Sequence, residues 1–328
     1  MFSSGPFEYH VVGIGNAIVD VLAKTDDAFL ERHNLVKGSM NLIDEEMAHT
    51  LYGEMGPARE ISGGSAANTV AGIAALGGKS AFIGKIADDE LGEIFAHDIR
   101  SMGVTFTTQP QAGINPTARS FVLVTPDAQR TMNTYLGASQ ALSAGDVDEI
   151  LIKSSLITFL EGYLWDPEEA KQAFLAAMDI AKAAGRSVAL TLSDAFCVKK
   201  YREEFLGLVE NRINILFANE VEITTLYETD NFEKALKNVT EKVDLAILTR
   251  SEKGSVILSA GNRIDVPAYP TQVVDTTGAG DSYAAGFLYA LTHGYALEEC
   301  GKLAARCASE VISHIGARPE IDLKTLLP

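Results

Sequence analysis

Short, unbroken apolar runs recur through the second half of the chain. Polar residues bound each of them, at 155–161, 187–193, 213–218 and 244–249. Runs of this kind are typical of strands that are buried on both faces of a parallel sheet. Stretches with helical spacing separate them, and a strand at 254–260 and two final helices follow. The alternation predicts an α/β fold with a doubly wound, mostly parallel sheet flanked by helices.

One of these helices has clear start and stop signals. Asp166 is expected to be its N-cap and Pro167 its first helical residue, with Glu168 and Glu169 in the first turn. Acidic side chains near the amino end of a helix interact favourably with its dipole. Gly185 is expected to end this helix.

The first half of the chain fits the alternation less well. Two β-rich runs surround Pro126 and Asp127 and predict a β-hairpin over 117–136. Together, the β-rich segments 16–49 and 105–136 predict a small second sheet. The large α/β domain is then expected to comprise residues 1–15, 50–104 and 137–328.

Composition and charge narrow the function classes. The chain has 328 residues, of which 47% are hydrophobic, and a net charge of −17. Such an acidic chain is a poor partner for nucleic acid or an anionic membrane surface, because both require a basic face. Three cysteines (Cys197, Cys300 and Cys307) form no CxxC pattern, and Cys300 and Cys307 are expected to be buried apolar residues.

The remaining bulk features concern location. The first residues, MFSSGPFEYH, carry neither a basic region nor an apolar core, so no signal peptide is expected. No apolar run approaches the roughly 20 residues that a membrane span needs. A cytoplasmic protein is therefore expected.

The segment VVDTTGAGDSYAAGFL, residues 273–288, combines glycines with an acid where a helix is expected to begin. Several N–H groups are unpaired at a helix amino end, which favours an anion there. Gly278 and Gly280 leave room for a phosphate to approach the backbone. Asp281, in the first turn, is a candidate to receive a hydroxyl proton, and its place at a helix amino end predicts a low pKa. The alternative is a plain left-handed turn with an acid at a helix start.

Two motifs resemble a known family. DTTGAGDSYAAGFL resembles the C-terminal signature of the ribokinase family, the phosphofructokinase-B-type sugar and nucleoside kinases, and SGGSAANTVAGIAALGG at 62–78 resembles its N-terminal signature. The resemblance implies a large α/β domain covered by a small β-sheet lid. It also implies that Asp281 is the catalytic base and that Gly278, Ala279 and Gly280 form the anion hole for the transferred phosphoryl group.

The same resemblance implies ATP and Mg²⁺ as cofactors. Asn219 and Glu222 match the family's Asn-x-x-Glu element and are expected to organise Mg²⁺ through water. By itself, this spacing is a common helix-capping pattern. Thr249 and Gly254 are expected to contact ATP in a loop where the family usually has a glycine in place of Ser251.

Two further assignments follow from the resemblance. Many members bind a monovalent cation beside the anion hole. By resemblance, four residues of this chain are candidate K⁺ ligands: Asp275, Thr277, Val311 and Gly316. Arg130 matches a lid arginine that reaches the transferred phosphate. The alternative for Arg130 is a solvated surface residue.

The substrate that accepts the phosphoryl group is expected to bind to residues in the first half of the chain. Asn16 and Asp20 in GNAIVD offer an amide and a carboxylate that together can bind a vicinal diol. The alternative is a pair of residues that shape a turn. By resemblance, Gly64, Ser65 and Asn68 complete a ribose site, and this form of the motifs is more similar to the adenosine kinases than to the ribokinases or fructokinases.

A nucleobase would need an apolar wall. Phe196 is the main candidate, and the alternative for it is a core residue. The weaker candidates for the same wall are Leu42, Leu136 and Tyr163. We expect an ATP-dependent nucleoside kinase, most similar to adenosine kinases, that is a monomer or a homodimer. The alternatives are a kinase of free sugars and a non-catalytic ligand-binding protein with the same fold.

Overall fold

The computed structural model describes residues 6–127, 129–240 and 242–328. Within these ranges, nine strands form one large sheet. Their spatial order is β14 (Asn262–Val266), β13 (Ser255–Ser259), β12 (Leu245–Thr249), β11 (Ile215–Asn219), β10 (Ser187–Thr191), β9 (Ser155–Glu161), β1 (Tyr9–Ile14), β5 (Ser80–Ile83) and β6 (Thr105–Phe106). All neighbours from β12 to β6 are parallel, and β13 and β14 are antiparallel.

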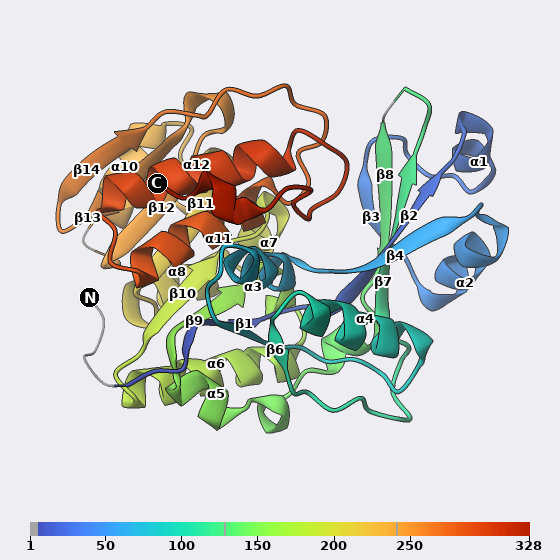
Figure 1. Cartoon of the computed structure of the whole chain (residues 1–328), viewed down its shortest axis with the longest axis horizontal. Coiled ribbons are helices and arrows are strands. Elements are labelled where there is room, and N and C mark those ends of the chain that lie inside the picture. Colours follow the sequence, from blue (N-terminus) through green and yellow to red (C-terminus); the bar gives the residue numbers. More distant parts are fainter. Residues whose placement is uncertain (1–5, 128, 241) are drawn as a thin grey trace.

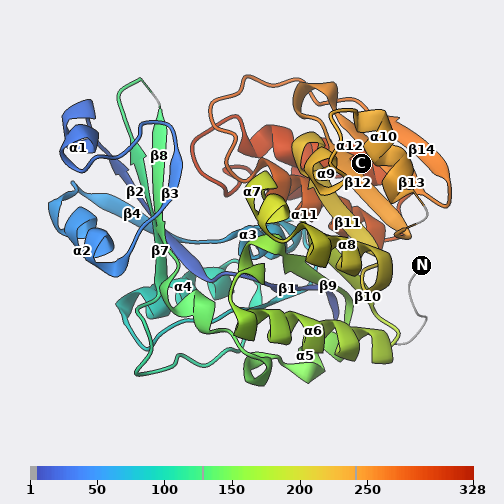
Figure 2. The same ribbon diagram turned by 180° about the vertical axis from the view of Figure 1, so that it is seen from behind.

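Helices cover both faces of this sheet, which confirms the predicted doubly wound α/β class (Figures 1 and 2). The hydrophobic cluster on one face includes α3 (Ser65–Ala75), α4 (Glu90–Ser101), α11 (Ala279–Thr292) and α12 (Leu297–Val311). The cluster on the other face includes α5 (Glu149–Lys153), α6 (Glu168–Ala183), α7 (Ala195–Lys200), α8 (Arg202–Asn211), α9 (Glu220–Leu226) and α10 (Phe232–Val239).

The predicted start of α6 is wrong by one residue. Pro167 is the N-cap, and Glu168 is the first helical residue. The side chain of Asp166 accepts hydrogen bonds from Lys200 and Tyr201 instead of capping the helix. A tertiary contact has therefore replaced the local one.

A second sheet stands beside the large one. Its spatial order is β3 (Met40–Leu42), β8 (Arg130–Tyr135), β7 (Ala118–Val124), β2 (Ile18–Lys24) and β4 (Ala58–Gly63). The predicted hairpin is the antiparallel pair of β7 and β8. Helices α1 (Asp27–Arg32) and α2 (Glu45–Glu54) lie on the side of this small sheet that faces away from the large one (Figure 1).

The strands cross the domain bounds that the pattern predicts. β4 lies within 50–104, yet it pairs with β2 of the small sheet, and Gly63 lies opposite Ile18. β6 lies within 105–136, yet it extends the large sheet beside β5. Strand pairing between distant segments decided both placements, and local hydrophobic patterning does not encode it.

The two faces of the small sheet differ in chemistry. Val19 and Phe121 belong to the hydrophobic cluster that also contains Phe29 of α1 and Leu51 of α2. Because side chains alternate along a strand, Asp20 points to the opposite face. Asp20 is in register with Ser120, and through Thr134 with Leu42 of β3. These side chains share the face without helices, on the side of the large sheet.

Cys300 and Cys307 are buried in the core, as predicted, and all three cysteines are free. Over the residues that the structure describes, which exclude 1–5 of the N-terminal stretch examined for a signal peptide, no helix is both long and apolar enough to cross a bilayer.

Three aromatic rings pack together where α11 meets the large sheet. The ring of Phe217 in β11 lies 5.8 Å from that of Phe287 in α11 and 5.9 Å from that of Phe159 in β9, measured between centroids. Phe287 is 0% exposed. Replacing Phe287 by alanine leaves a cavity under α11, so we expect F287A to lower the free energy of unfolding by about 3–5 kcal/mol. Urea denaturation monitored by circular dichroism measures it.

Ile150 in α5 is the matched control, because its side chain is 78% exposed. I150A is expected to change the free energy of unfolding by no more than about 0.5 kcal/mol. Equal losses in the two variants would contradict the assignment of Phe287 to the core.

Candidate active site

The carboxyl ends of the parallel strands gather the polar residues of the motifs. Asn16 follows β1, Glu161 ends β9 and Asn219 ends β11, where it is in register with Thr249 of β12. In doubly wound sheets this edge is where ligands bind. The amino ends of α3 and α11 lie at the same edge, so the two motif segments that are distant in sequence become neighbours.

Helices α3 and α11 pack side by side on one face of the large sheet (Figures 1 and 2). They approach closely because Gly72 of α3 has no side chain; a Cβ there would lie 2.7 Å from Cβ of Ala285. At their amino ends, Ser65 Oγ donates to Asp281 Oδ1 (2.6 Å), and Asn68 Nδ2 donates to Asp281 Oδ2 (2.9 Å). Both predicted motifs therefore converge on one carboxylate.

The environment of Asp281 differs from the one that a helix amino end suggests. A low pKa was expected for this acid, and that expectation is wrong. Burial raises the pKa of Asp281, while the hydrogen bonds from Ser65 and Asn68 and the charge of Arg318 oppose the rise. Removal of the carboxylate from water outweighs the favourable partners. A carboxylate with a raised pKa is a better proton acceptor than an exposed one.

The turn before α11 contains the residues that were predicted to form an anion hole. Gly278 is the N-cap, with a φ of +73°, and a Cβ on it would lie 2.7 Å from Cβ of Ala317. No side chain caps this helix end. Around Gly280, by contrast, a Cβ would meet nothing within 4 Å among the described residues. Ala279 and Gly280 thus begin a helix whose amino end is open to a ligand.

Glu161 is a buried acid that the sequence interpretation missed. Its Oε1 accepts from the backbone N (2.8 Å) and Nδ2 (2.5 Å) of Asn16, and its Oε2 accepts from the backbone N of Ala66 (2.7 Å). Burial raises the pKa of Glu161 to about 7. Its position as the polar end of an apolar strand was the only available signal. Glu161 joins the end of β1 to the first turn of α3.

Two buried amide oxygens have no partner within the described part of the chain. They are Oδ1 of Asn16 and Oδ1 of Asn68, whose residues are 2% and 8% exposed. An unpaired buried acceptor is costly, so such groups usually serve a ligand or water. Both were predicted to contact the acceptor, and hydroxyl groups are donors that fit them.

Asp20 faces the same region from the lid. It lies within β2, and a Cβ on Gly63 would overlap its carboxylate. Burial raises the pKa of Asp20 to about 7; Arg318 and Arg130 act against this rise, and Asp281 adds to it. Gly64, which was also predicted to line the ribose site, is the N-cap of α3. Asp20 therefore belongs to the electrostatic environment of Asp281 although it sits on another sheet.

Arg130 reaches the large domain from the start of β8 and pairs with Asp275. The Asp275 carboxylate also accepts from the backbone N–H groups of Thr277 (Oδ1, 2.8 Å) and Gly316 (Oδ2, 2.8 Å). Val311 ends α12 beside this loop. The predicted K⁺ ligands are thus close together, but a guanidinium already neutralises the acid. The donor set does not fit K⁺ while this ion pair is present.

Asn219 and Glu222 form a capping box at the start of α9. Asn219 Oδ1 accepts from the backbone N of Glu222 (2.8 Å), and the Glu222 carboxylate accepts from the backbone N (2.9 Å) and Nδ2 (2.6 Å) of Asn219. Burial raises the pKa of Glu222 to about 7. Each carboxylate oxygen keeps a free lone pair. The pair therefore fits Mg²⁺ held through water rather than by direct ligation.

The loop after β12 turns at Ser251. Ser251 has a φ of +51°, the left-handed region that glycine adopts without strain. Gly254 closes the same turn and donates to the carbonyl of Ser251 (3.1 Å). Ser251 thus holds a backbone conformation that favours glycine, at the position where the family usually has one.

The four apolar candidates lie on separate elements. Phe196 in α7 is 67% exposed and Leu42 in β3 is 62% exposed, which excludes both from the core. Tyr163 and Leu136 are half-buried just after β9 and β8. Exposed apolar side chains on α7 and on the open face of the lid are available to a ligand that lies between them.

The sequence interpretation also missed Arg318. It lies in the loop after α12, and the charges of Asp98, Asp20 and Asp281 act on it.

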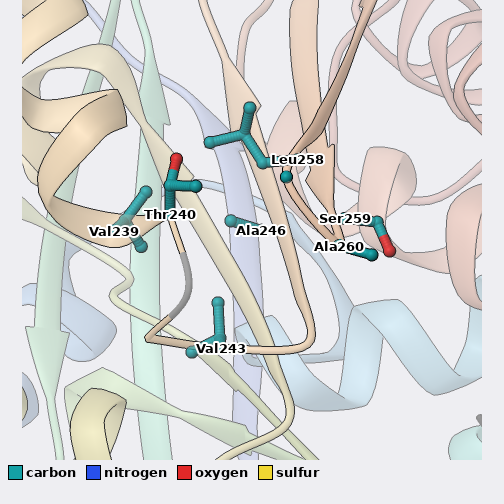
Figure 3. Close-up of a pocket in the computed structure, with 8 residues that line it drawn as sticks. Val239, Thr240, Val243, Ala246, Leu258, Ser259 and Ala260 are labelled. Carbon is teal, nitrogen blue, oxygen red and sulfur yellow. The ribbon is translucent and has the colours of Figure 1, made fainter.

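Figure 3 shows a hollow that lies away from these residues and is lined by Val239, Val243, Ala246 and Leu258. It lies near the amino end of β12, at the edge of the sheet opposite the motif residues, and we assign it to packing.

Comparison with known proteins agrees with this geometry. The solved structure of adenosine kinase from Sinorhizobium meliloti is 53% identical, covers 97% of this chain and 98% of its own, and superposes with a TM-score of 0.89. A probable sugar kinase protein from Rhizobium etli CFN 42 is 49% identical, covers 97% of each chain and gives a TM-score of 0.90. The probable fructokinase-5 of Arabidopsis thaliana is 31% identical and covers 79% of this chain and 84% of its own.

The match to a family model is equally broad. Residues 34–323 match the model of the pfkB family carbohydrate kinases, a span that takes in both motif segments and the lid hairpin. The chain therefore belongs to the pfkB family of carbohydrate kinases, which transfer a phosphoryl group to a hydroxyl group.

Proposed function

We propose that this protein is an ATP-dependent nucleoside kinase, an adenosine kinase in particular, that phosphorylates the 5′-hydroxyl of the ribose. The observation that carries the proposal is the carboxylate of Asp281, which Ser65 and Asn68 hold where the amino ends of α3 and α11 meet. The choice of a nucleoside is supported by the 53% identity with the adenosine kinase of Sinorhizobium meliloti.

In the proposed reaction, Asp281 accepts the proton of the 5′-hydroxyl as its oxygen attacks the γ-phosphorus of ATP. The bond from that phosphorus to the bridging oxygen breaks, and ADP leaves with the electron pair. The transition state of phosphoryl transfer is loose, so positioning and charge stabilisation supply most of the catalysis. The raised pKa of Asp281 suits a base that accepts its proton late.

Charge on the transferred group is stabilised from two sides. The amino end of α11, at Gly278, Ala279 and Gly280, offers backbone dipoles from the large domain. Arg130 offers its guanidinium from the lid once it exchanges Asp275 for phosphate oxygens. Asn219 and Glu222 would hold Mg²⁺ through water, and that ion would neutralise charge on the ATP phosphates.

The acceptor site is proposed to lie under the lid. Asp20 and the free Oδ1 atoms of Asn16 and Asn68 would accept hydrogen bonds from ribose hydroxyls. Leu42 and Phe196 would contact the base. Closure of the lid would exclude water and so protect ATP from hydrolysis.

A kinase of free sugars is the second candidate, because a probable sugar kinase and a probable fructokinase are among the relatives. Such an enzyme has no base to bind, so the exposed Phe196 and Leu42 would be without a role. A non-catalytic ligand-binding protein is disfavoured, since the chain retains Asp281, Asn219 and Glu222.

A panel of acceptors with ATP and Mg²⁺ tests the substrate. We expect adenosine to have the highest kcat/KM among adenosine, other nucleosides, ribose and fructose, because only a nucleoside uses both the diol site and the apolar side chains. ADP release in a coupled assay measures it. A higher kcat/KM for a free sugar would contradict the proposal and favour the second candidate.

The base assignment is tested with D281N. The amide cannot accept the hydroxyl proton, so kcat is expected to fall by at least about 100-fold with little change in KM for ATP. D230N, at an exposed aspartate, is the control and should retain kcat. Near-normal turnover by D281N would exclude Asp281 as the base.

The role of Asp20 predicts a pH dependence. Because its pKa is about 7, its carboxyl is protonated at lower pH and then accepts ribose hydroxyls poorly. KM for the nucleoside should therefore rise as pH falls below 7. D20N should have a higher KM that no longer shows this dependence. Steady-state kinetics from roughly pH 6 to pH 9 measure it. An unchanged pH dependence in D20N would assign the titration to another group.

A further inference from the structure

Arg318 is a partly buried arginine that joins three parts of the molecule. From the loop after α12, its Nε (3.2 Å) and Nη2 (2.8 Å) donate to the carbonyl of Ser62, and Nη2 also donates to Ser62 Oγ (3.0 Å). Its Nη1 donates to the carbonyl of Ala67 (3.2 Å). Ser62 lies in lid strand β4 and Ala67 in the first turn of α3. The guanidinium therefore holds the lid strand and the helix together.

Ser62 is held from its other side as well. Its backbone N (2.8 Å) and its Oγ (2.6 Å) both donate to Asp98 Oδ2 in α4. Asp98 is also the first of the charges that favour the protonated form of Arg318, whose pKa burial lowers to about 10. Arg318 therefore remains cationic at neutral pH, with a planar fork that fits two backbone acceptors.

The turn between β4 and α3 lies between the two carbonyls that Arg318 binds, and it connects the small sheet to the candidate site. Gly64 has a φ of +98°, and a Cβ on it would overlap the carbonyl of Asn16. Ser65, the next residue, donates to Asp281. Because the carbonyls of Ser62 and Ala67 flank this turn, the position of Arg318 fixes where Ser65 stands relative to Asp281.

Arg318 also places a positive charge near the acids around Asp281. The groups that act on the site are acids from three elements, Asp20 of β2, Glu161 of β9 and Asp281 itself, together with the phenol of Tyr163. Arg318 is the cation that lowers the pKa of both Asp20 and Asp281, and Arg130 also acts on Asp20. Arg130 is engaged in an ion pair with Asp275, whereas hydrogen bonds to the carbonyls of Ser62 and Ala67 hold Arg318 in place beside the acceptor site.

We propose that Arg318 is a positioning residue for phosphoryl transfer: its fork fixes the β4–α3 turn that presents Ser65 and Asn68 to Asp281, and its charge faces the acids Asp20 and Asp281. This inference rests on the proposed function for its kinetic consequences. The positioning role itself concerns the turn and can be tested without any acceptor.

Two variants of Arg318 separate the effect of its hydrogen-bonding geometry from the effect of its charge. R318Q removes the charge, so the acidic limb of the kcat/KM profile should move up by about one pH unit, toward less acidic values. R318K keeps the charge but loses the fork, so it should leave the limb in place and lower kcat by about tenfold. R306Q is the matched control, because Arg306 donates to the carbonyl of Leu326 and does not act on the site acids. It should leave both quantities unchanged.

Hydrogen–deuterium exchange over residues 62–69 gives a readout that does not depend on activity. Faster exchange there in both Arg318 variants, with the remaining helices protected, is expected. If R318Q does not fold, R318K carries the test through kcat and exchange. A folded R318Q with the wild-type pH limb, or a folded R318K with wild-type kcat and exchange, would overturn the proposal. If the wild type phosphorylates none of the acceptors, the proposed function fails, and the exchange data alone decide the role of Arg318.

Discussion

The close packing of α3 against α11 is the contact on which the candidate site depends. Gly72 allows the two helices to approach, and their amino ends then meet at the carboxyl edge of the large sheet. Unpaired N–H groups and the positive ends of two helix dipoles converge there. In that position, Asp281 accepts hydrogen bonds from Ser65 and Asn68 instead of from water. The same packing therefore brings an open helix amino end and a carboxylate together, at the places that we propose for a phosphate and for the base.

Buried acids concentrate around this point, and their cost explains much of the surrounding structure. Burial raises the pKa of Asp20, Glu161 and Glu222 to about 7. Each acid is then partly compensated by donors that also define geometry: Asn16 and Ala66 for Glu161, and Asn219 for Glu222. Compensation and positioning are thus performed by the same contacts. A site built in this way is sensitive to pH near neutrality.

The lid and the large domain are joined by arginines at two places. Arg130 pairs with Asp275 beside the anion hole, and Arg318 binds Ser62 at the end of β4. The first pair links the tip of a hairpin to a loop. The second anchors a turn that is held on both sides.

The sequence by itself determined the fold class and most of the motif residues. Unbroken apolar runs predicted the buried parallel strands, and the glycine-rich segment predicted where α11 begins, because both signals are local. The tertiary structure alone decided the rest. β4 joined the small sheet through pairing with β2, and Asp166 bound Lys200 and Tyr201 rather than capping α6. Glu161 and Arg318 acquired their roles from partners distant in sequence, and burial reversed the expected pKa shift of Asp281, because desolvation depends on the whole fold.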